Sequence, residues 1–233
     1  MRKKLQYRTL LPIYSILLLG FLIIAIGGSR AVTVLSENAP ISNRKVVIID
    51  AGHGGIDGGA TSCTGVLESQ INLEISKKLN DLLHLIGIDT VMIRTGDYSI
   101  HTKEGSISQI KISDLKERVR IINSTENAIL LSIHQNYFSD SKYSGAQTFY
   151  APTSGSKELA TSIQETLKLL DNTNNRQIKK ADGIYLMQHI ACPGVLIECG
   201  FLSNTVEEAL LRNADYQNKL CSIIASACSL YLH

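Results

Sequence analysis

Residues 45–59 read KVVIIDAGHGGIDGG, in which a run of β-branched residues ends at an acid and gives way to glycines. The apolar run predicts a strand buried on both faces, because no polar side chain alternates within it. The glycines predict a sharp turn directly after that strand, since glycine reaches backbone angles that other residues resist. His53 stands in the middle of this turn and is therefore the first candidate for a functional residue.

The rest of the chain repeats this alternation of short apolar runs and helical patterns. Further strands are predicted at residues 89–95, 128–134, 146–151, 183–187 and 194–200. Apolar residues at helical spacing predict helices over residues 71–86, 113–122, 159–170 and 220–231, the second of them capped by Ser113. Together these elements predict a single α/β domain, with a mostly parallel or mixed sheet of about six strands and helices on both faces.

The amino terminus carries a basic flank followed by an apolar run, which is the pattern of an exported protein. Residues 2–8 hold four lysines and arginines, and residues 10–27 are almost uninterruptedly apolar. A run of this length favours a membrane anchor slightly, although the small residues that follow would also suit a signal peptidase. The predicted organisation is a signal peptide or membrane anchor at 1–31, a linker at 32–44 and the folded domain at 45–233.

The amino-acid composition indicates which kinds of binding partner are improbable for this chain. The net charge is +2 and no basic stripe interrupts the folded part, which argues against a nucleic-acid partner. The chain has no tryptophan and few other aromatic residues, so the sequence shows no obvious surface for stacking sugar rings. Its five cysteines lack paired spacing, and we expect small buried thiols rather than a disulfide framework.

Four side chains with acid–base or metal-binding chemistry fall where predicted elements begin or end. His53, His134 and Glu198 follow or close three strands, and Glu68 begins the first helix. Because open α/β sheets place their sites at the carboxyl ends of the strands, we expect these four residues to converge. Two histidines and one carboxylate suit zinc with one position left open, and the second carboxylate is then free to act as a general base.

Structural explanations also exist for these residues. A lone histidine at a strand end is often a hydrogen-bonded polar residue, and an acid at a helix start often serves the helix dipole. Glu198 is harder to explain in this way, since it interrupts the apolar run VLIEC and a buried carboxylate needs a metal, a cation or a proton. A phosphate-binding loop is the rival explanation for the glycines, but the stretch lacks the Lys-Ser/Thr ending of a P-loop and does not fit GxGxxG.

Four motifs resemble, in the same order, those of the zinc-dependent N-acetylmuramoyl-L-alanine amidases of the type-3 family: DAGHGG…DGGA, GVLESQINLEISKKL, SIHQN and VLIECGFLSN. The resemblance covers about residues 45–232, nearly the whole exported part. It implies His53, Glu68 and His134 as zinc ligands and Glu198 as the catalytic carboxylate.

The resemblance also points to residues around the metal. Asp50 and Asn136 match positions close to it, and Arg118 matches a recurring arginine whose alternative role is a salt bridge on a helix surface. Two departures stand out: Ala51 occupies a position where the family usually has proline, and Cys199 follows the catalytic glutamate where an apolar residue is common. Neither departure removes a ligand.

The implied reaction is hydrolysis of the amide between the lactyl group of N-acetylmuramic acid and L-alanine of the peptidoglycan stem peptide, with Zn2+ as cofactor. Segments such as SGAQTFYA and DGIYLMQ are similar to members from spore-forming bacteria, which implies action on spore cortex on the way to muramic-δ-lactam, at the forespore envelope. Some members carry a long helical insert and need an activator protein. The segment between His134 and Glu198 leaves little room for such an insert, and an activating partner remains possible.

Three other functions are compatible with parts of the sequence. An exported zinc peptidase acting on stem peptides would use the same ligands and differ only in its products. A non-catalytic peptidoglycan-binding domain would have no use for a free carboxylate beside the metal. A nucleotide-binding α/β domain conflicts with the export pattern and the missing phosphate motif.

Overall fold

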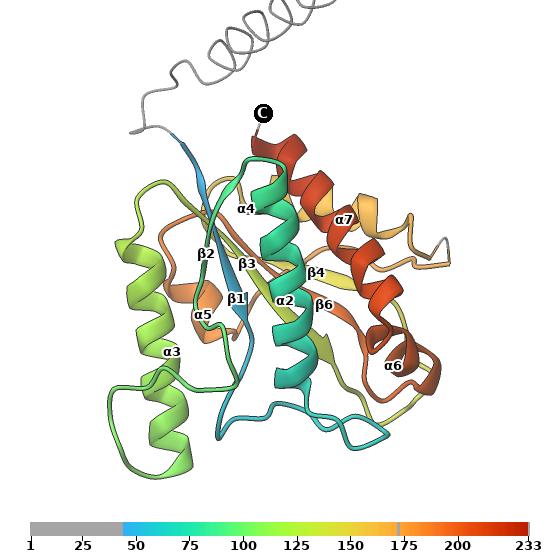
Figure 1. The fold of residues 1–233 in the computed structure, drawn as a ribbon, viewed down its shortest axis with the longest axis horizontal. Helices are drawn as coiled ribbons and strands as arrows, with labels where there is room; N and C mark the ends of the chain where they lie inside the picture. The colour runs from blue at the N-terminus through green and yellow to red at the C-terminus, as the bar shows by residue number, and fades with distance from the viewer. Residues whose placement is uncertain (1–43, 172, 233) are drawn as a thin grey trace, which may run out of the picture. The chain divides into compact units, whose positions relative to one another are not determined.

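The computed structural model describes residues 44–171 and 173–232, so the predicted anchor and nearly all of the linker lie outside the described residues. Six strands form one sheet in the order β2-β1-β3-β6-β4-β5 (Figure 1). The strands are β1 (Val46–Ala51), β2 (Asp89–Met92), β3 (Ala128–Asn136), β4 (Gln147–Tyr150), β5 (Lys179–Lys180) and β6 (Gly194–Phe201). The helices are α2 (Glu68–Leu85), α3 (Ile107–Ser124), α4 (Ser156–Leu167), α5 (Tyr185–His189), α6 (Thr205–Leu211) and α7 (Ala214–Leu232).

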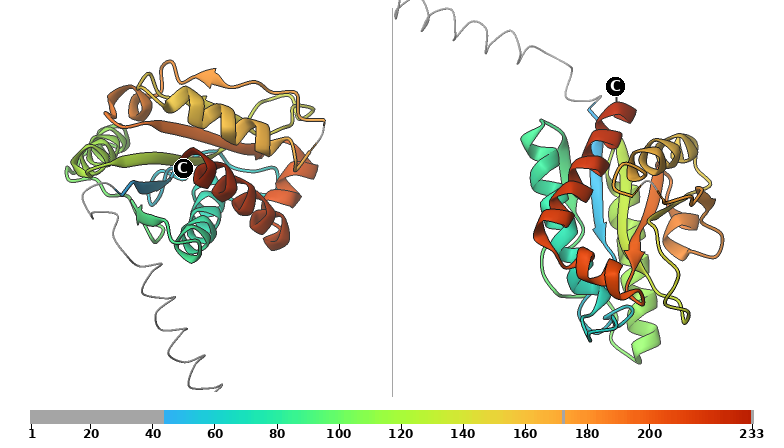
Figure 2. Two further views of the ribbon diagram at one scale, coloured as in Figure 1. Left: turned by 90° about the horizontal axis from the view of Figure 1, so that it is seen from above. Right: turned by 90° about the vertical axis from the view of Figure 1, so that its right-hand side faces the viewer.

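The sheet is mixed. β2, β1, β3 and β6 run parallel, whereas β4 is antiparallel to β6 and parallel to β5. Side chains of α2, α4 and α7 pack with one face of the central strands, and side chains of α3 and α5 pack with the other (Figures 1 and 2). Burial on both faces explains why the strands are apolar throughout, and the predicted fold class is confirmed.

The parallel strands give the domain two different ends. β1 starts at the end where α7 finishes, and its arrow points to the opposite end, where α2 starts (Figure 1). At that opposite end, Asp50 lies across from Ser132 of β3, and His134 of β3 lies across from Glu198 of β6. The topology therefore gathers the polar residues of three strands at one edge of the sheet.

Some predicted elements were wrong in detail. The strand expected at 183–187 is instead a turn at Gly183, with φ of +81°, followed by the short helix α5. A five-residue apolar run is compatible with either element, and here burial of Leu186 and Met187 against the second core favours the helix. Strand ends also differ from the prediction by one to three residues: β3 and β6 run one or two residues further than expected, whereas β2 stops three residues earlier and β4 is one residue shorter at each end.

The start of α3 was also predicted wrongly. The helix begins at Ile107 and is capped by Ser106, whose side chain forms a capping box with Gln109. Ser113 lies inside the helix, where its hydroxyl accepts hydrogen bonds from the backbone of Thr102 and Lys103. The strand β5 and the helix α6 were not predicted, because both are too short to show a clear period.

The described cysteines are all unpaired. Cys199, Cys221 and Cys228 are buried, and burial raises the pKa of the last two thiols to about 12. Cys63, by contrast, is exposed, so the expectation of buried thiols does not hold for every cysteine.

Within residues 44–171 and 173–232, no helix combines the length and the apolar character needed to cross a membrane.

Candidate metal centre

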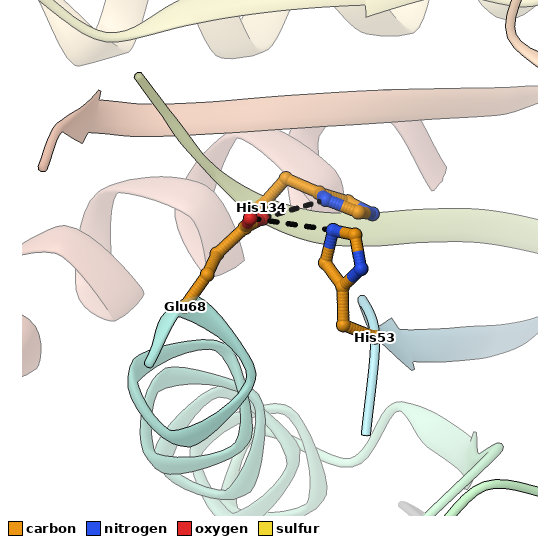
Figure 3. Close-up of side chains that lie close together, drawn as sticks. All are labelled: His53, Glu68 and His134. Carbon is orange, nitrogen blue, oxygen red and sulfur yellow. Dashed lines mark hydrogen bonds and ion pairs between the residues drawn. The ribbon is translucent and has the colours of Figure 1, made fainter. Parts of the chain in front are cut away.

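His53, Glu68 and His134 point toward one another at the carboxyl end of the parallel strands (Figure 3). The Nε2 atom of His53 lies 3.3 Å from one carboxylate oxygen of Glu68, and Nδ1 of His134 lies 2.9 Å from the other. One ligand atom from each residue lies within 4.8 Å of the others, and the two imidazole rings meet edge to face with centroids 5.0 Å apart. The convergence expected from the sequence therefore occurs for these three side chains.

The glycines of the loop make room for this cluster. A Cβ at Gly52 would lie 2.2 Å from the ring of His134, and a Cβ at Gly59 would lie 2.5 Å from the carboxylate of Glu68. His53 itself adopts a left-handed backbone with φ of +63°, a conformation uncommon outside glycine. The sequence predicted a turn, and the structure shows that His53 shares the positive-φ conformation with Gly54, Gly55 and Gly59, while Gly52 and Gly59 also leave space for the cluster.

Glu68 is fixed by the backbone as well as by the histidines. Its carboxylate accepts hydrogen bonds from the N–H of Ala60 at 2.9 Å, from the N–H of Gln135 at 3.2 Å and from the side-chain amide of Asn72 at 3.2 Å. Burial alone would raise the pKa of Glu68, but the hydrogen bonds with His134 and His53 outweigh it and hold the pKa well below its ordinary value. Glu68 is therefore ionised and oriented, as a metal ligand must be.

The outer nitrogen of His53 has a carboxylate partner that the sequence did not reveal. Nδ1 of His53 lies 2.8 Å from Asp57, and Asp57 in turn lies 2.7 Å from the ammonium group of Lys111 on α3. Burial alone would lower the pKa of His53, but Asp57 and Glu68 raise it to about 9. A carboxylate that holds the outer N–H of a histidine orients the inner nitrogen, here Nε2, toward Glu68, where it would bind a metal after losing its proton.

Glu198 lies next to His134 in the neighbouring strand. Among the residues that the structure describes, its Oε2 atom is buried without a hydrogen-bond partner. Burial raises the pKa of Glu198 to about 7, assisted by the negative charge of Glu68 and opposed by His134 and His53. A carboxylate left in this state beside three metal-binding groups is the strongest sign of function in the domain, since such a group is costly unless it acts on a ligand.

A second charged cluster lies beneath the loop that carries His53. Arg118 is 2% exposed and pairs with Asp50 and, at 2.6 Å, with Asp114. Its remaining donors reach the backbone carbonyls of Ala51 at 3.0 Å and His53 at 2.7 Å. Arg118 is therefore a buried clamp on the loop, and the alternative of a surface salt bridge is wrong.

Arg94 acts on the same loop from the other side and was missed in the sequence. It is fully buried and donates to the carbonyls of Ala51 at 2.8 Å and Gly52 at 3.0 Å, and to the carbonyl of Ser69 in the first turn of α2 at 2.8 Å. The sequence did contain a sign that Arg94 is buried. Like Glu198, it is a charged residue next to an apolar run, and such a residue needs a partner. Two buried arginines thus fix a loop whose glycines would otherwise leave it free.

The other residues expected near the metal differ in their placement. The carboxylate of Asp50 accepts from Ser132 at 2.7 Å as well as from Arg118, and it supports the loop rather than joining the histidines. Asn136 ends β3 two residues beyond His134, after a shift in register with β6, and its carbonyl accepts from Leu202 at 2.8 Å.

A cavity of about 190 Å3 reaches this edge of the sheet from the side of α3 and α5. His53 and His134 line it together with apolar side chains such as Ile110, Leu186 and Leu196. Pockets with mostly apolar walls and a few polar groups in convergent positions are typical of ligand sites. The histidines are therefore accessible to a bound molecule.

The donor set fits zinc. Two imidazoles and one carboxylate form one of the ligand sets of catalytic zinc sites, which leave a fourth position open. Zinc bonds of about 2.1 Å in tetrahedral geometry place neighbouring donors about 3.4 Å apart, and one ligand atom from each of the three residues lies within 4.8 Å of the others, so small movements would complete such a set. Glu198, whose Oε2 has no partner among the described residues, lies opposite His134 in the next strand.

The fold and this donor set define an α/β domain with a candidate metal centre at the carboxyl ends of its parallel strands. Comparison with known proteins is more specific: the model of a family described as N-acetylmuramoyl-L-alanine amidase matches residues 47–229. The chain belongs to this amidase family.

Individual relatives that are named as amidases support this family assignment. The germination-specific N-acetylmuramoyl-L-alanine amidase of Bacillus subtilis is 39% identical over 228 residues, which cover 96% of this chain and 93% of the relative. The solved structure of the CwlD amidase from Clostridioides difficile, in complex with the GerS lipoprotein, matches with a TM-score of 0.78 and 43% identity, over 81% of this chain and 98% of that one. An N-acetylmuramoyl-L-alanine amidase from Clostridium difficile 630 matches with a TM-score of 0.72 and 33% identity, over 82% and 98% of the two chains.

Proposed function

We propose that the chain hydrolyses the amide between the lactyl group of N-acetylmuramic acid and L-alanine in peptidoglycan, with His53, Glu68 and His134 holding a zinc ion and Glu198 moving the proton. The observation that carries this proposal is the buried, unpartnered carboxylate oxygen of Glu198 beside the three donors. Membership of the amidase family supports the choice of bond.

The residues of the site have different roles in the proposed reaction. Bound zinc supplies Lewis acidity, which lowers the pKa of water towards about 7 and polarises a carbonyl group. Glu198 accepts the proton of the attacking water and returns it to the departing amine, and a pKa near neutrality suits a group that must do both. Asp57 contacts the outer nitrogen of His53 and would leave Nε2 as the atom that holds the ion.

Mass spectrometry of purified peptidoglycan tests the reaction. The full chain, supplied with zinc, should release stem peptides that begin with L-alanine and leave glycan strands with free lactyl groups. Glu198→Gln should release none. Fragments cut between amino acids would instead identify a zinc peptidase, and an untouched polymer that still binds the chain would identify a non-catalytic binding domain.

The substrate is proposed to be spore cortex. Support comes from the name of the Bacillus subtilis relative, a germination-specific amidase whose similarity spans nearly the whole of both chains. Removal of the stem peptide would expose the muramic acid from which muramic-δ-lactam forms, and a separate enzyme would close the ring. Peptidoglycan from cortex and from vegetative walls, digested side by side, distinguishes a cortex-specific enzyme from a general one.

We also propose an activating partner and an extracytoplasmic location. The CwlD amidase was solved in complex with the GerS lipoprotein, which supports a lipoprotein partner for this chain. Between His134 and Glu198 the described chain forms β4, α4, β5, α5 and most of β6, with no long helix beyond these that could block the site. A partner would therefore act by some means other than removing such a helix.

The basic and apolar start of the sequence supports export and membrane attachment, which flotation of the full chain with lipid vesicles would test.

A further inference from the structure

An exposed group of aromatic side chains lies beyond the carboxyl ends of β3 and β6. Tyr137, Phe138 and Tyr143, which are 53%, 49% and 42% exposed, belong to the segment that joins β3 to β4. Phe201, the last residue of β6, is buried next to Tyr143. We refer to Phe138, Tyr143 and Phe201, whose rings contact one another, as the aromatic surface, next to which Tyr137 is also exposed. It is found only in the structure, because the sequence suggested no surface for stacking sugars.

The rings of the aromatic surface support one another. Phe138 meets Tyr143 edge to face with centroids 4.8 Å apart, and Tyr143 stacks on Phe201 at 6.4 Å with planes 28° apart. The guanidinium of Arg176 covers the ring of Phe201 at 4.5 Å. Edge-to-face and offset contacts of this kind are favourable, so the rings of Phe138 and Tyr143 are held in fixed directions. The ammonium group of Lys142 lies 5.9 Å from the centroid of the Tyr143 ring, so a ligand would share that ring with Lys142 and meet Phe138 beside it.

The backbone beneath these rings is also fixed. The hydroxyl of Ser203 accepts the N–H of Phe138 at 3.2 Å, and the amide of Asn204 donates to the carbonyl of Tyr143 at 3.3 Å. Glu207 accepts two further backbone N–H groups of the region, both at 2.8 Å. A surface prepared in this way loses little conformational entropy when it binds a ligand.

The charges around the aromatic surface are already paired. Lys142 forms an ion pair with Asp140 at 2.7 Å, and Arg176 donates to the carbonyl of Ser144 at 2.6 Å while it packs on the aromatic ring. A subsite for a stem peptide, which carries carboxylates, would be expected to present unpaired cations. An uncharged ligand with apolar faces and hydroxyls at its edges suits tyrosine and phenylalanine better.

The aromatic surface is close enough to the site to contact the same substrate. Phe138 lies four residues beyond His134, and Phe201 lies three residues beyond Glu198. At about 3.3 Å per residue, these separations are roughly 10–13 Å along the strands. A sugar attached to the reacting lactyl group must lie at the metal centre, so a sugar two or three positions further along the strand can reach this surface.

We propose that the aromatic surface binds sugar rings of the glycan strand, whose N-acetylated hexosamine rings are themselves uncharged, beside the muramic acid whose amide is cleaved. This rests on the proposed amidase function and adds to it a subsite that recognises the polymer rather than the peptide. Exposed apolar patches of this kind on monomeric proteins commonly mark ligand or partner sites.

Calorimetric titration of the full chain tests the subsite without using hydrolysis as a readout. The probes are a tetramer of N-acetylglucosamine, which is uncharged, glycan strands freed of peptide, which carry lactyl carboxylates, and a free stem peptide. The double variant Phe138→Ala/Tyr143→Ala should raise the Kd for both glycan probes about tenfold, since two stacking rings are lost. Tyr143→Phe should keep the affinity because it retains the ring. Leu85→Ala is the matched control, as Leu85 is 81% exposed and lies at the end of α2 remote from the site.

The possible outcomes distinguish a failure of the proposed glycan subsite from a failure of the proposed amidase reaction. Wild-type protein that binds neither glycan probe, or a double variant that binds them as tightly as wild type, would overturn the subsite. Loss of binding to the stem peptide alone would also overturn it and assign the surface to the peptide. Failure of the wild type to release stem peptides from peptidoglycan would overturn the amidase instead, whatever the titrations show.

Discussion

Two groups of charged side chains lie at the carboxyl end of β1 and differ in how their charges are balanced. Around Arg118, two carboxylates and three carbonyl or hydroxyl groups satisfy one another, and the pKa of Asp50 lies below its ordinary value because its partners outweigh the effect of burial. Around Glu68, the histidines are drawn together but Glu198 keeps an unpartnered oxygen and a raised pKa.

This difference separates a structural cluster from a candidate catalytic one. A buried charge that is fully paired stabilises one conformation and has no spare capacity for a ligand. A buried carboxylate with a free oxygen is stable only because the surrounding fold holds it there, as is common at functional sites. The first group therefore holds the loop, and the second group contains the unpartnered carboxylate on which the proposed function rests.

The largest effect is expected from Glu198→Gln. The amide can neither accept nor return the proton, so hydrolysis should fall about 1000-fold. Because Glu198 is not among the three donors, the variant should still bind zinc, as measured by competition with a coloured chelator. Glu165→Gln, an exposed change on α4, is the control and should leave both unchanged. Loss of zinc binding in Glu198→Gln would make Glu198 a ligand and contradict this division.

Arg118→Met should mainly affect stability. It leaves Asp50 buried without its cation, and breaking a buried ion pair in this way costs about 3–5 kcal/mol of the free energy of unfolding. Urea denaturation of the metal-free protein measures the change. Arg120→Met removes an exposed pair with Glu117 from the same helix and should cost less than about 1 kcal/mol. Equal effects of the two substitutions would show that the buried cluster does not stabilise the fold.

Asp57→Asn should weaken metal binding without unfolding the domain. The amide holds the outer N–H of His53 less strongly, and the loss of such a partner lowers metal affinity about 10- to 100-fold. The affinity is measured by chelator competition, and the midpoint of thermal unfolding of the metal-free variant checks the fold. Asp81→Asn, on the exposed side of α2, is the matched control. An unchanged zinc affinity in Asp57→Asn would remove Asp57 from the metal centre.

The sequence predicted the strands and the candidate ligands better than it predicted what holds them. Glu198 and His134 could be found because a polar residue at the end of an apolar strand has a restricted set of explanations. Asp57 lies four residues after His53, but the conformation of a glycine-rich loop, and so the direction of that side chain, cannot be predicted from composition. Lys111 gave no signal, since the helix that carries it begins earlier than its apolar pattern indicated.

The aromatic surface illustrates a different limit. Its members come from the segment after β3 and from the end of β6, and only the pairing of these strands brings them together. A count of aromatic residues treats them as scattered. Contacts between distant segments depend on register and topology, which local patterns do not specify.

The smallest effect is expected from pH, and it concerns Asp50. Its pKa in the folded protein is below the ordinary value of 3.8, so its charge stabilises the fold fully above about pH 4. That contribution is lost as the pH falls through the lower, folded value, because the folded protein then takes up a proton as well. Unfolding of the metal-free wild type and of Asp50→Asn, measured in urea from pH 6 to pH 3, should therefore show a stability difference that narrows on acidification. A stability difference that stays constant over this pH range would mean that Asp50 contributes through packing and neutral hydrogen bonds rather than through its charge. The contrast between the paired cluster around Arg118 and the unpaired carboxylate of Glu198 would then have no electrostatic basis.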